Sequence, residues 1–297
     1  MNMRSRKTAQ HTEQFEAPKS QRRMSVSSVL VHIILVILAL IVISPLIIPF
    51  FFTFKTPLEF AYNPWGLPEK LRWSNFEQAW KMVRIGEGLK NSLQVCIGAV
   101  LFTVPPAAMA GYIFAFYRSR VTNVLFYVVM AGFFVPVHMV LIPLYQFSTK
   151  IGITNTFAGV FLPIAAFGIP FWTIIYRSFY SGLPKDMVEA GRIDGAGHFT
   201  VFMRIIFPMA KPATVLAVLL SFMGGWSDFI IGLIMLSSQS KFTMQLRISQ
   251  FIGNLGANYF PQYAAGVIIS SLPTIILYLI FHKYIIEGTT LAGAIKG

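Results

Sequence analysis

The chain has 297 residues, of which 55% are hydrophobic and only 12% are charged, and its mean hydropathy is +0.65. Soluble domains carry about twice that share of charged residues, so the composition excludes an ordinary soluble globular protein. A single cysteine excludes a disulfide scaffold. The formal net charge of +13 has to be located along the chain before it can indicate a partner.

Six apolar segments are long enough to cross a bilayer as helices, which takes roughly 20 residues. In chain order they are 26–54, 92–116, 121–147, 157–176, 213–236 and 264–284. The first follows a basic start, but it is longer than the roughly 7–15 residues of a signal-peptide core and lacks an A-x-A cleavage site. We interpret it as a retained helix. The sequence therefore predicts an all-α membrane protein with six transmembrane helices.

The basic residues predict the orientation. Fifteen of the 24 lysines and arginines lie in the arm 1–25, the 2–3 turn, the connection between the fourth and fifth spans, and the chain end. The positive-inside rule places both termini and that connection in the cytoplasm. The predicted division is an arm 1–25, a six-helix domain 26–284 and a tail 285–297. No basic surface interleaved with aromatic residues is visible, so we expect the lipid bilayer and not nucleic acid as the partner of the excess charge.

Two outer connections carry local signals. Ser74 and Glu77 have the spacing of a capping box, which predicts that a short helix begins there. The neighbouring aromatic residues Trp73, Phe76 and Trp80 suit either an anchor at the membrane interface or a binding site. The later connection 237–263 is polar and aromatic, and it either contacts an outside partner or is a solvated connector.

The connection at 181–212 is the longest on the cytoplasmic side. Pro184 suits the first turn of a helix, Asp186 lies near its positive end, and Gly195 is placed to stop it. Gly191 and Gly195 leave one side of that helix almost bare. This bare side either packs against the chain's own helices or admits a partner surface.

Residues in this connection carry a family resemblance. Their spacing resembles E-A-A-x3-G-x9-I-x-L-P, the EAA loop of binding-protein-dependent ABC import permeases. The matching positions are Glu189, Ala190, Gly191, Gly195, Ile205, Phe207 and Pro208. Gly191 replaces an alanine of the pattern and Phe207 a leucine, and the glycine weakens a helix by up to about 1 kcal/mol.

Further segments resemble the maltose-type sugar importers, namely 142–145, 152–156, 183–184, 192–196 and 287–297. The resemblance implies a type I ABC importer permease fold in the cytoplasmic membrane and a sugar or oligosaccharide cargo. Alternatives are the same permease role for a polyol, a glycerol phosphate ester or an acidic oligosaccharide, or a stand-alone secondary transporter. The last would show inverted repeats or an acid–base relay, and we see neither.

The resemblance also implies partners. These are two ATP-binding subunits, a second homologous permease and an extracytoplasmic solute-binding protein. The chain has no G-x-x-x-x-G-K-[ST] motif, so we expect it to be non-catalytic, with ATP and Mg bound by the partner ATPase. By the same resemblance, a helix around 189–195 seats in the ATPase and transmits its closure. The implied coupling residues are Glu189, Ala190, Gly191, Arg192, Asp194, Gly195, Ile205 and Pro208.

Polar residues inside the predicted spans are candidates for a substrate pathway, because they are costly in a bilayer. Asp228 either hydrogen-bonds a sugar hydroxyl, with Trp226 stacking on the ring, or caps a broken helix. His138, between Pro136 and Pro143, either lines the passage or pairs with a neighbouring helix, and these prolines predict a kink. No histidines have metal-ligand spacing, and Cys96 indicates packing, so no metal is expected.

Overall fold

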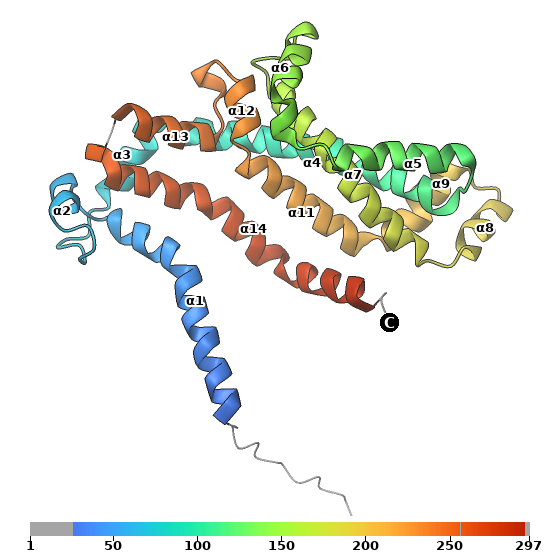
Figure 1. Ribbon diagram of the computed structural model, residues 1–297, viewed down its shortest axis with the longest axis horizontal. Coiled ribbons are helices and arrows are strands. Elements are labelled where there is room, and N and C mark those ends of the chain that lie inside the picture. Colours follow the sequence, from blue (N-terminus) through green and yellow to red (C-terminus); the bar gives the residue numbers. More distant parts are fainter. Residues whose placement is uncertain (1–25, 256, 295–297) are drawn as a thin grey trace, which may run out of the picture. The chain divides into compact units, whose positions relative to one another are not determined.

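The computed structural model describes residues 26–255 and 257–294, with side chains from Val29 to Lys283 except at 46 and 254–257. The predicted arm 1–25 lies outside the described residues, and so do the side chains of the tail. The described chain is helical and has no strand (Figure 1). Its α-helices are α1 Val26–Phe52, α2 Pro57–Tyr62, α3 Ser74–Met82, α4 Ile85–Phe116, α5 Arg120–Phe133, α6 Leu141–Lys150, α7 Phe157–Ser181, α8 Asp186–Ile193, α9 His198–Val201, α10 Phe207–Met209, α11 Lys211–Ser227, α12 Ile230–Met235, α13 Met244–Leu255 and α14 Phe260–Ala294. Four short helical turns lie between them: η1 Val137–Val140, η2 Phe202–Ile206, η3 Gln239–Lys241 and η4 Ala257–Tyr259.

The chain divides into two units, residues 1–47 and 48–297. The described part of the first unit is the apolar start of α1, whose side chains from Val29 onward are almost all exposed. Exposed apolar side chains along a whole helix suit a lipid environment. The second unit holds all the other helices.

Three helices of the described chain are long and apolar enough to cross a membrane: α4, α7 and the part of α14 from Phe260 to Lys283. Two bent pairs raise the number to as many as five, and Val29–Pro45 of α1 is a shorter apolar helix. Each predicted span therefore corresponds to helical structure, but the count of six crossings stays a prediction.

The predicted kink between Pro136 and Pro143 is confirmed, because α5 and the η1–α6 segment meet at 89°. The predicted fifth span is also broken, into α11 and α12 at Asp228 and Phe229. Proline removes a backbone donor, and the aspartate offers the backbone an alternative acceptor, so both breaks occur where the helical ladder loses a bond.

The α4 and α7 helices form the principal helix pair of the second unit. A Cβ built on Gly111 of α4 would lie 2.6 Å from the Tyr176 Cβ and 2.9 Å from the Arg177 amide nitrogen of α7. Because those atoms belong to or adjoin the backbone, only glycine permits this approach. On another face of α4, Gly225 of α11 lies against Cys96, whose thiol is buried as a packing residue.

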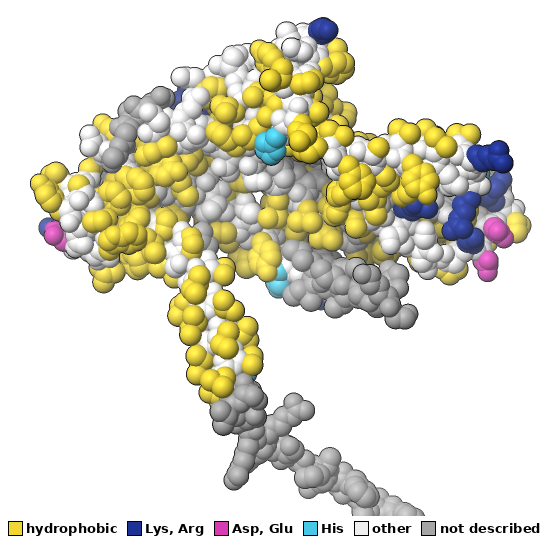
Figure 2. Space-filling model, viewed as in Figure 1, with side chains coloured by type: hydrophobic (Ala, Val, Ile, Leu, Met, Phe, Trp, Pro, Cys, Tyr) yellow, Lys and Arg dark blue, Asp and Glu magenta, His cyan; other side chains and the backbone are white. Residues whose placement is uncertain are grey.

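The buried side chains form three clusters along the α4–α7 pair. One gathers where α8 and α9 meet the pair, another where α12 and α13 meet it, and the third between α3, α13 and α14. Figure 1 shows α8 and α9 at one end of this bundle and α3 and α13 at the other. We call these the α8 end and the α13 end. Figure 2 shows hydrophobic side chains over most of the visible face, with charged side chains gathered mainly at the α8 end.

The predicted short helix does begin at Ser74, but the capping box is wrong. Trp73 is the cap residue and makes no side-chain capping bond, while Glu77 pairs with Lys81 at 2.6 Å. The hydrogen bond from Lys81 lowers the pKa of Glu77. A true capping box occurs earlier, where Thr56 and Glu59 begin α2. The Glu77 carboxylate therefore binds the lysine one turn later in the helix and not the backbone at the helix start.

Adjacent glycines of α11 test the close packing on α4. Replacing Gly225 with leucine forces the new side chain into the Cys96 backbone, whose Cα lies 3.2 Å from the built Cβ. We expect Gly225→Leu to lower the free energy of unfolding by about 1–3 kcal/mol, the usual cost of overpacking. Gly224→Leu is the matched control, since nothing described lies within 4 Å of its Cβ. Thermal melting of both purified variants measures the difference, and equal melting temperatures would contradict the packing argument.

Candidate coupling site

The α8 helix has a buried face and an exposed face. Val188 and Gly191 are buried against the chain, while Glu189, Ala190 and Ile193 are exposed. Asp186 and Glu189 lie in the first turn, where the helix dipole favours negative charge. The buried face holds the helix to the bundle and leaves the other face free to meet a partner.

A Schellman motif ends α8 at the predicted stop. The Gly195 amide donates to the Arg192 carbonyl at 3.0 Å, and the Ala196 amide donates to the Gly191 carbonyl at 3.0 Å. Gly195 has φ +81°, which only glycine adopts without strain, and nothing described lies within 4 Å of its Cβ position. Gly195 therefore ends the helix, and its surroundings stay open.

The side of α8 that carries Gly191 and Gly195 was expected either to pack within the chain or to admit a partner surface. The two glycines differ in this respect. A Cβ on Gly191 would lie 2.8 Å from the Ile205 Cδ1 and 3.2 Å from the Val201 Cγ2. Gly191 therefore packs within the chain, and Ile205 fills the space that the alanine of the family pattern would take. Gly195 faces no described atom, which leaves room for another surface.

The segment after α8 returns to the bundle and packs on it. Val201, Phe202 and Ile206 are buried with Tyr112 of α4 and Tyr176 of α7 in the cluster at the α8 end. The rings of Tyr112 and Phe202 lie 5.3 Å apart. The chain then turns by 83° into α11, near Pro208, whose side chain is exposed. The segment that follows α8 is therefore packed directly against α4 and α7.

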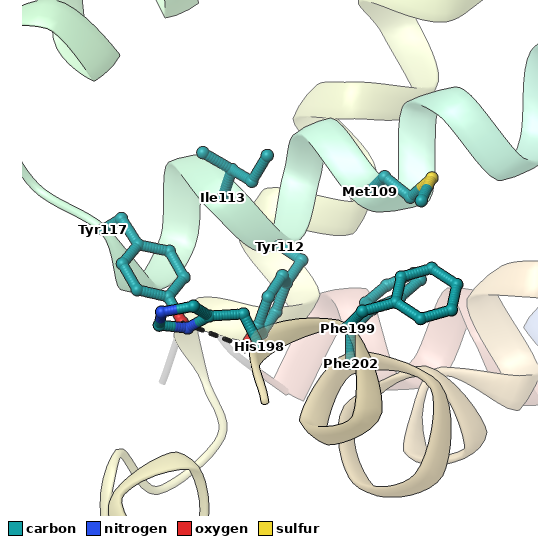
Figure 3. A pocket seen from close by; sticks show the side chains of 7 residues that line it. All are labelled: Met109, Tyr112, Ile113, Tyr117, His198, Phe199 and Phe202. Carbon is teal, nitrogen blue, oxygen red and sulfur yellow. Dashed lines mark hydrogen bonds between the residues drawn. The ribbon is translucent and has the colours of Figure 1, made fainter. Parts of the chain in front are cut away.

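A hollow of about 360 Å³ lies beside this cluster, between α4 and the start of the returning segment (Figure 3). At its rim the Tyr117 hydroxyl hydrogen-bonds the His198 Nδ1, and Tyr112 hydrogen-bonds Tyr117 at 3.2 Å. The remaining lining is apolar: Met109, Ile113, Phe199 and Phe202. The Tyr117–His198 bond is a second tie between the end of α4 and the connection 181–212.

The charged coupling candidates have no ionic partner within the described chain. Its salt bridges involve Glu77, Glu87 and their cations at the α13 end, not Glu189, Arg192 or Asp194. Asp194 lies at the negative end of α8, and no lysine or arginine forms a salt bridge with it among the described residues. These charges remain available to a partner.

The sequence missed two features of the site. Ile193 is 85% exposed although it is apolar, and α8 presents it beside the predicted positions. Tyr117 and His198 are far apart in the chain, and only the fold brings them together. The one signal that the sequence offered is the isoleucine between the charged residues Arg192 and Asp194, because an apolar side chain in such a setting is unusual on a solvent-exposed surface.

The three pathway candidates lie in different settings. The Asp228 carboxylate accepts hydrogen bonds from the Gly232 amide at 2.9 Å and the Ile231 amide at 3.4 Å, so it caps α12, as the structural alternative predicted. Trp226 is 3% exposed and donates to the Ser270 carbonyl at 3.1 Å. His138 is exposed in η1 at the bend.

Comparison with known proteins identifies the family. A sequence model described as "Binding-protein-dependent transport system inner membrane component" matches residues 107–289, which include α8 and the connection around it. The chain belongs to this family. It is therefore a permease subunit, a multi-pass protein of the cytoplasmic membrane. The family is non-catalytic and works with an ATPase and a binding protein.

Individual relatives cover nearly the whole chain. The diacetylchitobiose uptake system permease protein NgcG of Streptomyces coelicolor is 29% identical over 94% of this chain and 92% of its own length. The melibiose/raffinose/stachyose import permease protein MelC of Bacillus subtilis is 30% identical over 89% and 96%. A chain of a bacterial ABC transporter that imports the acidic polysaccharide alginate superposes with a TM-score of 0.74 over 90% of this permease and 99% of its own length. At 21% identity it supports the fold alone, a type I permease fold.

Substitutions at Gly195 test the end of α8. Gly195→Val places a β-branched residue at φ +81°, so we expect it to lower the free energy of unfolding by about 1–2 kcal/mol. Gly195→Asn should cost less, because asparagine tolerates this conformation. Gly191→Ala is the control, since its gain in helix propensity of up to about 1 kcal/mol offsets the shift of the flexible Ile205 end. Melting temperatures of the purified permease rank the variants, and a ranking with Gly195→Val equal to Gly195→Asn would contradict the assignment.

Proposed function

We propose that this permease imports a sugar or oligosaccharide as part of an ATP-driven complex. The relatives NgcG, MelC and an arabinooligosaccharide permease, AraQ of Bacillus subtilis, are named for such cargo and support the choice over a polyol or a phosphate ester. The observation that carries the coupling role is the two-faced α8. Its buried face joins the core of the permease, while its exposed face has no partner in the described chain.

The proposed complex contains two ATP-binding subunits, a second homologous permease and an extracytoplasmic solute-binding protein. ATP and Mg bind to the ATPase subunits. We place both termini and the α8 end in the cytoplasm, because the basic residues gather there. Six crossings, with the division at residues 26 and 284, belong to the same proposal.

The coupling contact is assigned to one surface of the connection 181–212. Exposed Glu189, Ala190, Arg192 and Asp194 meet the ATPase, and Ile193 inserts between them. Gly191, Gly195, Ile205 and Pro208 shape the helix and its return. Closure of the ATPases on ATP displaces α8, and the packed cluster carries that displacement to α4 and α7. The two states must contact the ATPase differently for this to transmit energy.

In the substrate pathway, His138 is the candidate that the fold leaves accessible. It lies at the bend between α5 and α6, and an imidazole can exchange hydrogen bonds with a hydroxyl-rich cargo. We assign Trp226 and Asp228 to the support of the pathway, because the indole is buried and the carboxylate caps α12.

Ile193 supplies the sharpest test of the coupling contact. Burying it on the ATPase would contribute about 1.5–3 kcal/mol, so Ile193→Asp should weaken binding of the ATP-binding subunit at least tenfold. The tagged permease is purified in mild detergent, and the proteins that accompany it are identified and quantified by mass spectrometry.

Two controls accompany this experiment. Ile193→Leu keeps an apolar side chain and should retain the ATPase, and so should Leu67→Asp, which changes an exposed leucine in the connection between α2 and α3. Recovery of no ATP-binding subunit with the unaltered chain would overturn the proposed function. Equal recovery with Ile193→Asp would overturn the coupling role of this face.

A further inference from the structure

The hollow between α4 and the segment that returns from α8 has one polar end and one apolar end. Figure 3 shows the hydrogen-bonded pair of Tyr117 and His198 at one end, and Met109 and Phe199 at the other. None of the described residues that line the hollow is acidic. Its volume of about 360 Å³ lies within the usual range of ligand pockets, roughly 300–1,000 Å³. A ligand with a polar head and an apolar body fits this arrangement.

The apolar end of the hollow continues along α4. Exposed apolar side chains recur every four residues on this helix, at Leu93, Ile97, Leu101, Pro105, Met109 and Ile113. Residues four apart lie on the same side of a helix, so these side chains form a band along most of its length, which we call the α4 band. Because α4 is long and apolar enough to cross a membrane, the α4 band suits contact with lipid chains. Its last two members, Met109 and Ile113, line the hollow, which therefore opens toward the bilayer.

The polar end of the hollow has an unused hydrogen-bonding group. The Tyr117 hydroxyl is hydrogen-bonded to the Nδ1 of His198, and this histidine is exposed. The Nε2 of the same ring forms no hydrogen bond with the part of the chain that the structure describes. Since each imidazole nitrogen can donate or accept one hydrogen bond, Nε2 is the atom left for a ligand.

Two arginines adjoin this end of the hollow. Arg118 directly follows Tyr117, and Arg120 is the first residue of α5. Both side chains are exposed, and neither forms a salt bridge with another described residue. A guanidinium group pairs with phosphate oxygens through two parallel hydrogen bonds. The charge beside the polar end therefore complements a phosphate group.

We propose that the hollow is a binding site for an anionic phospholipid of the inner leaflet. The lipid phosphate meets Arg118, Arg120 and His198. One acyl chain follows Ile113 and Met109 along the α4 band. This order matches the bilayer, because the polar end lies beyond the end of α4 and the apolar lining lies within the helix.

The site rests on the proposed function, which places the α8 end in the cytoplasm. Basic sites at the cytoplasmic surface of a membrane attract anionic lipids, at about 1 kcal/mol for each lysine or arginine. The bound lipid fills the space between α4 and the segment that returns from α8. It adds contacts between these two parts of the permease where the described chain leaves a gap.

Native mass spectrometry of the complete complex in mild detergent measures the binding. The complex is titrated with phosphatidylglycerol and, separately, with phosphatidylcholine that carries the same acyl chains. Arg118→Gln combined with Arg120→Gln removes both charges, so we expect the tightest phosphatidylglycerol to bind about tenfold more weakly or worse. Lys70→Gln combined with Arg72→Gln is the matched control, since it removes two exposed cations from the connection between α2 and α3. The control should bind phosphatidylglycerol as the unaltered complex does, and phosphatidylcholine should not distinguish the variants.

A second pair of variants tests the place of the acyl chain without a change of charge. Met109→Trp fills the apolar end of the hollow, so we expect it to lose the tightly bound phosphatidylglycerol. Ile97→Trp adds the same ring to the α4 band outside the hollow and should retain the lipid. Both positions are exposed, and the recovery of the ATP-binding subunit with each variant checks that the permease is folded.

Four results have defined meanings. Recovery of no ATP-binding subunit with the unaltered chain would overturn the proposed function. An intact complex whose phosphatidylglycerol binding is unchanged by the arginine pair, or by Met109→Trp, would overturn the lipid site alone. Displacement of the lipid by excess glycerol phosphate, which has no acyl chain, would show a site for a free phosphate ester instead. Binding to the permease alone but not to the complete complex would show that a partner subunit covers the hollow, which also overturns the proposal.

Discussion

The close contact of α4 with α7 is the constraint on which the other features depend. Gly111 lets the α4 backbone lie against α7 at Tyr176 and Arg177. The tyrosines around this contact form the surface on which the segment after α8 packs. Val201, Phe202 and Ile206 are buried on this surface. The candidate coupling site therefore depends on the helix pair as well as on the connection that carries the family pattern.

The α8 helix divides its residues between two tasks. Gly191 and Val188 serve the fold, while Glu189 and Ile193 remain outside it. Such a division is what a transmitting element requires, because a helix that were loose on its own subunit would move without carrying the bundle with it. The Schellman motif at Gly195 adds stiffness at the end where the chain reverses. The replacement of the pattern alanine by Gly191 has its counterpart in the Ile205 side chain, which occupies the vacated volume.

At the α13 end, polar side chains hold the irregular segment 236–247 in place, whereas apolar packing holds α8. Irregular backbone near a membrane needs every donor and acceptor satisfied within the protein. Asn155, Asn91 and Ser92 supply hydrogen-bond partners to this segment from two sides, and Arg247 at its end pairs with Glu87 of α4. The same helices thus carry a polar attachment at one end and an apolar attachment at the other. Asp228 follows the same rule on a smaller scale, since it caps α12 where the fifth apolar segment breaks.

The sequence by itself determined the class of protein and the place of the helix α8. Apolar runs of bilayer length admit few alternatives to helices, and a glycine after a short amphipathic run marks where a helix stops, because these signals act over a few neighbouring residues. The bend at Pro136 and the cap at Asp228 were predictable for the same reason. The predicted capping box at Ser74 was wrong, because Glu77 pairs with Lys81 one turn later in the helix. Only the tertiary structure decided which glycine packs and which stays open, how Tyr117 meets His198, and how Asn155 binds the amides of Ser237 and Ser238. The contacts of Tyr117 with His198 and of Asn155 with Ser238 join residues 81 and 83 positions apart, and nothing in local spacing or propensity encodes them.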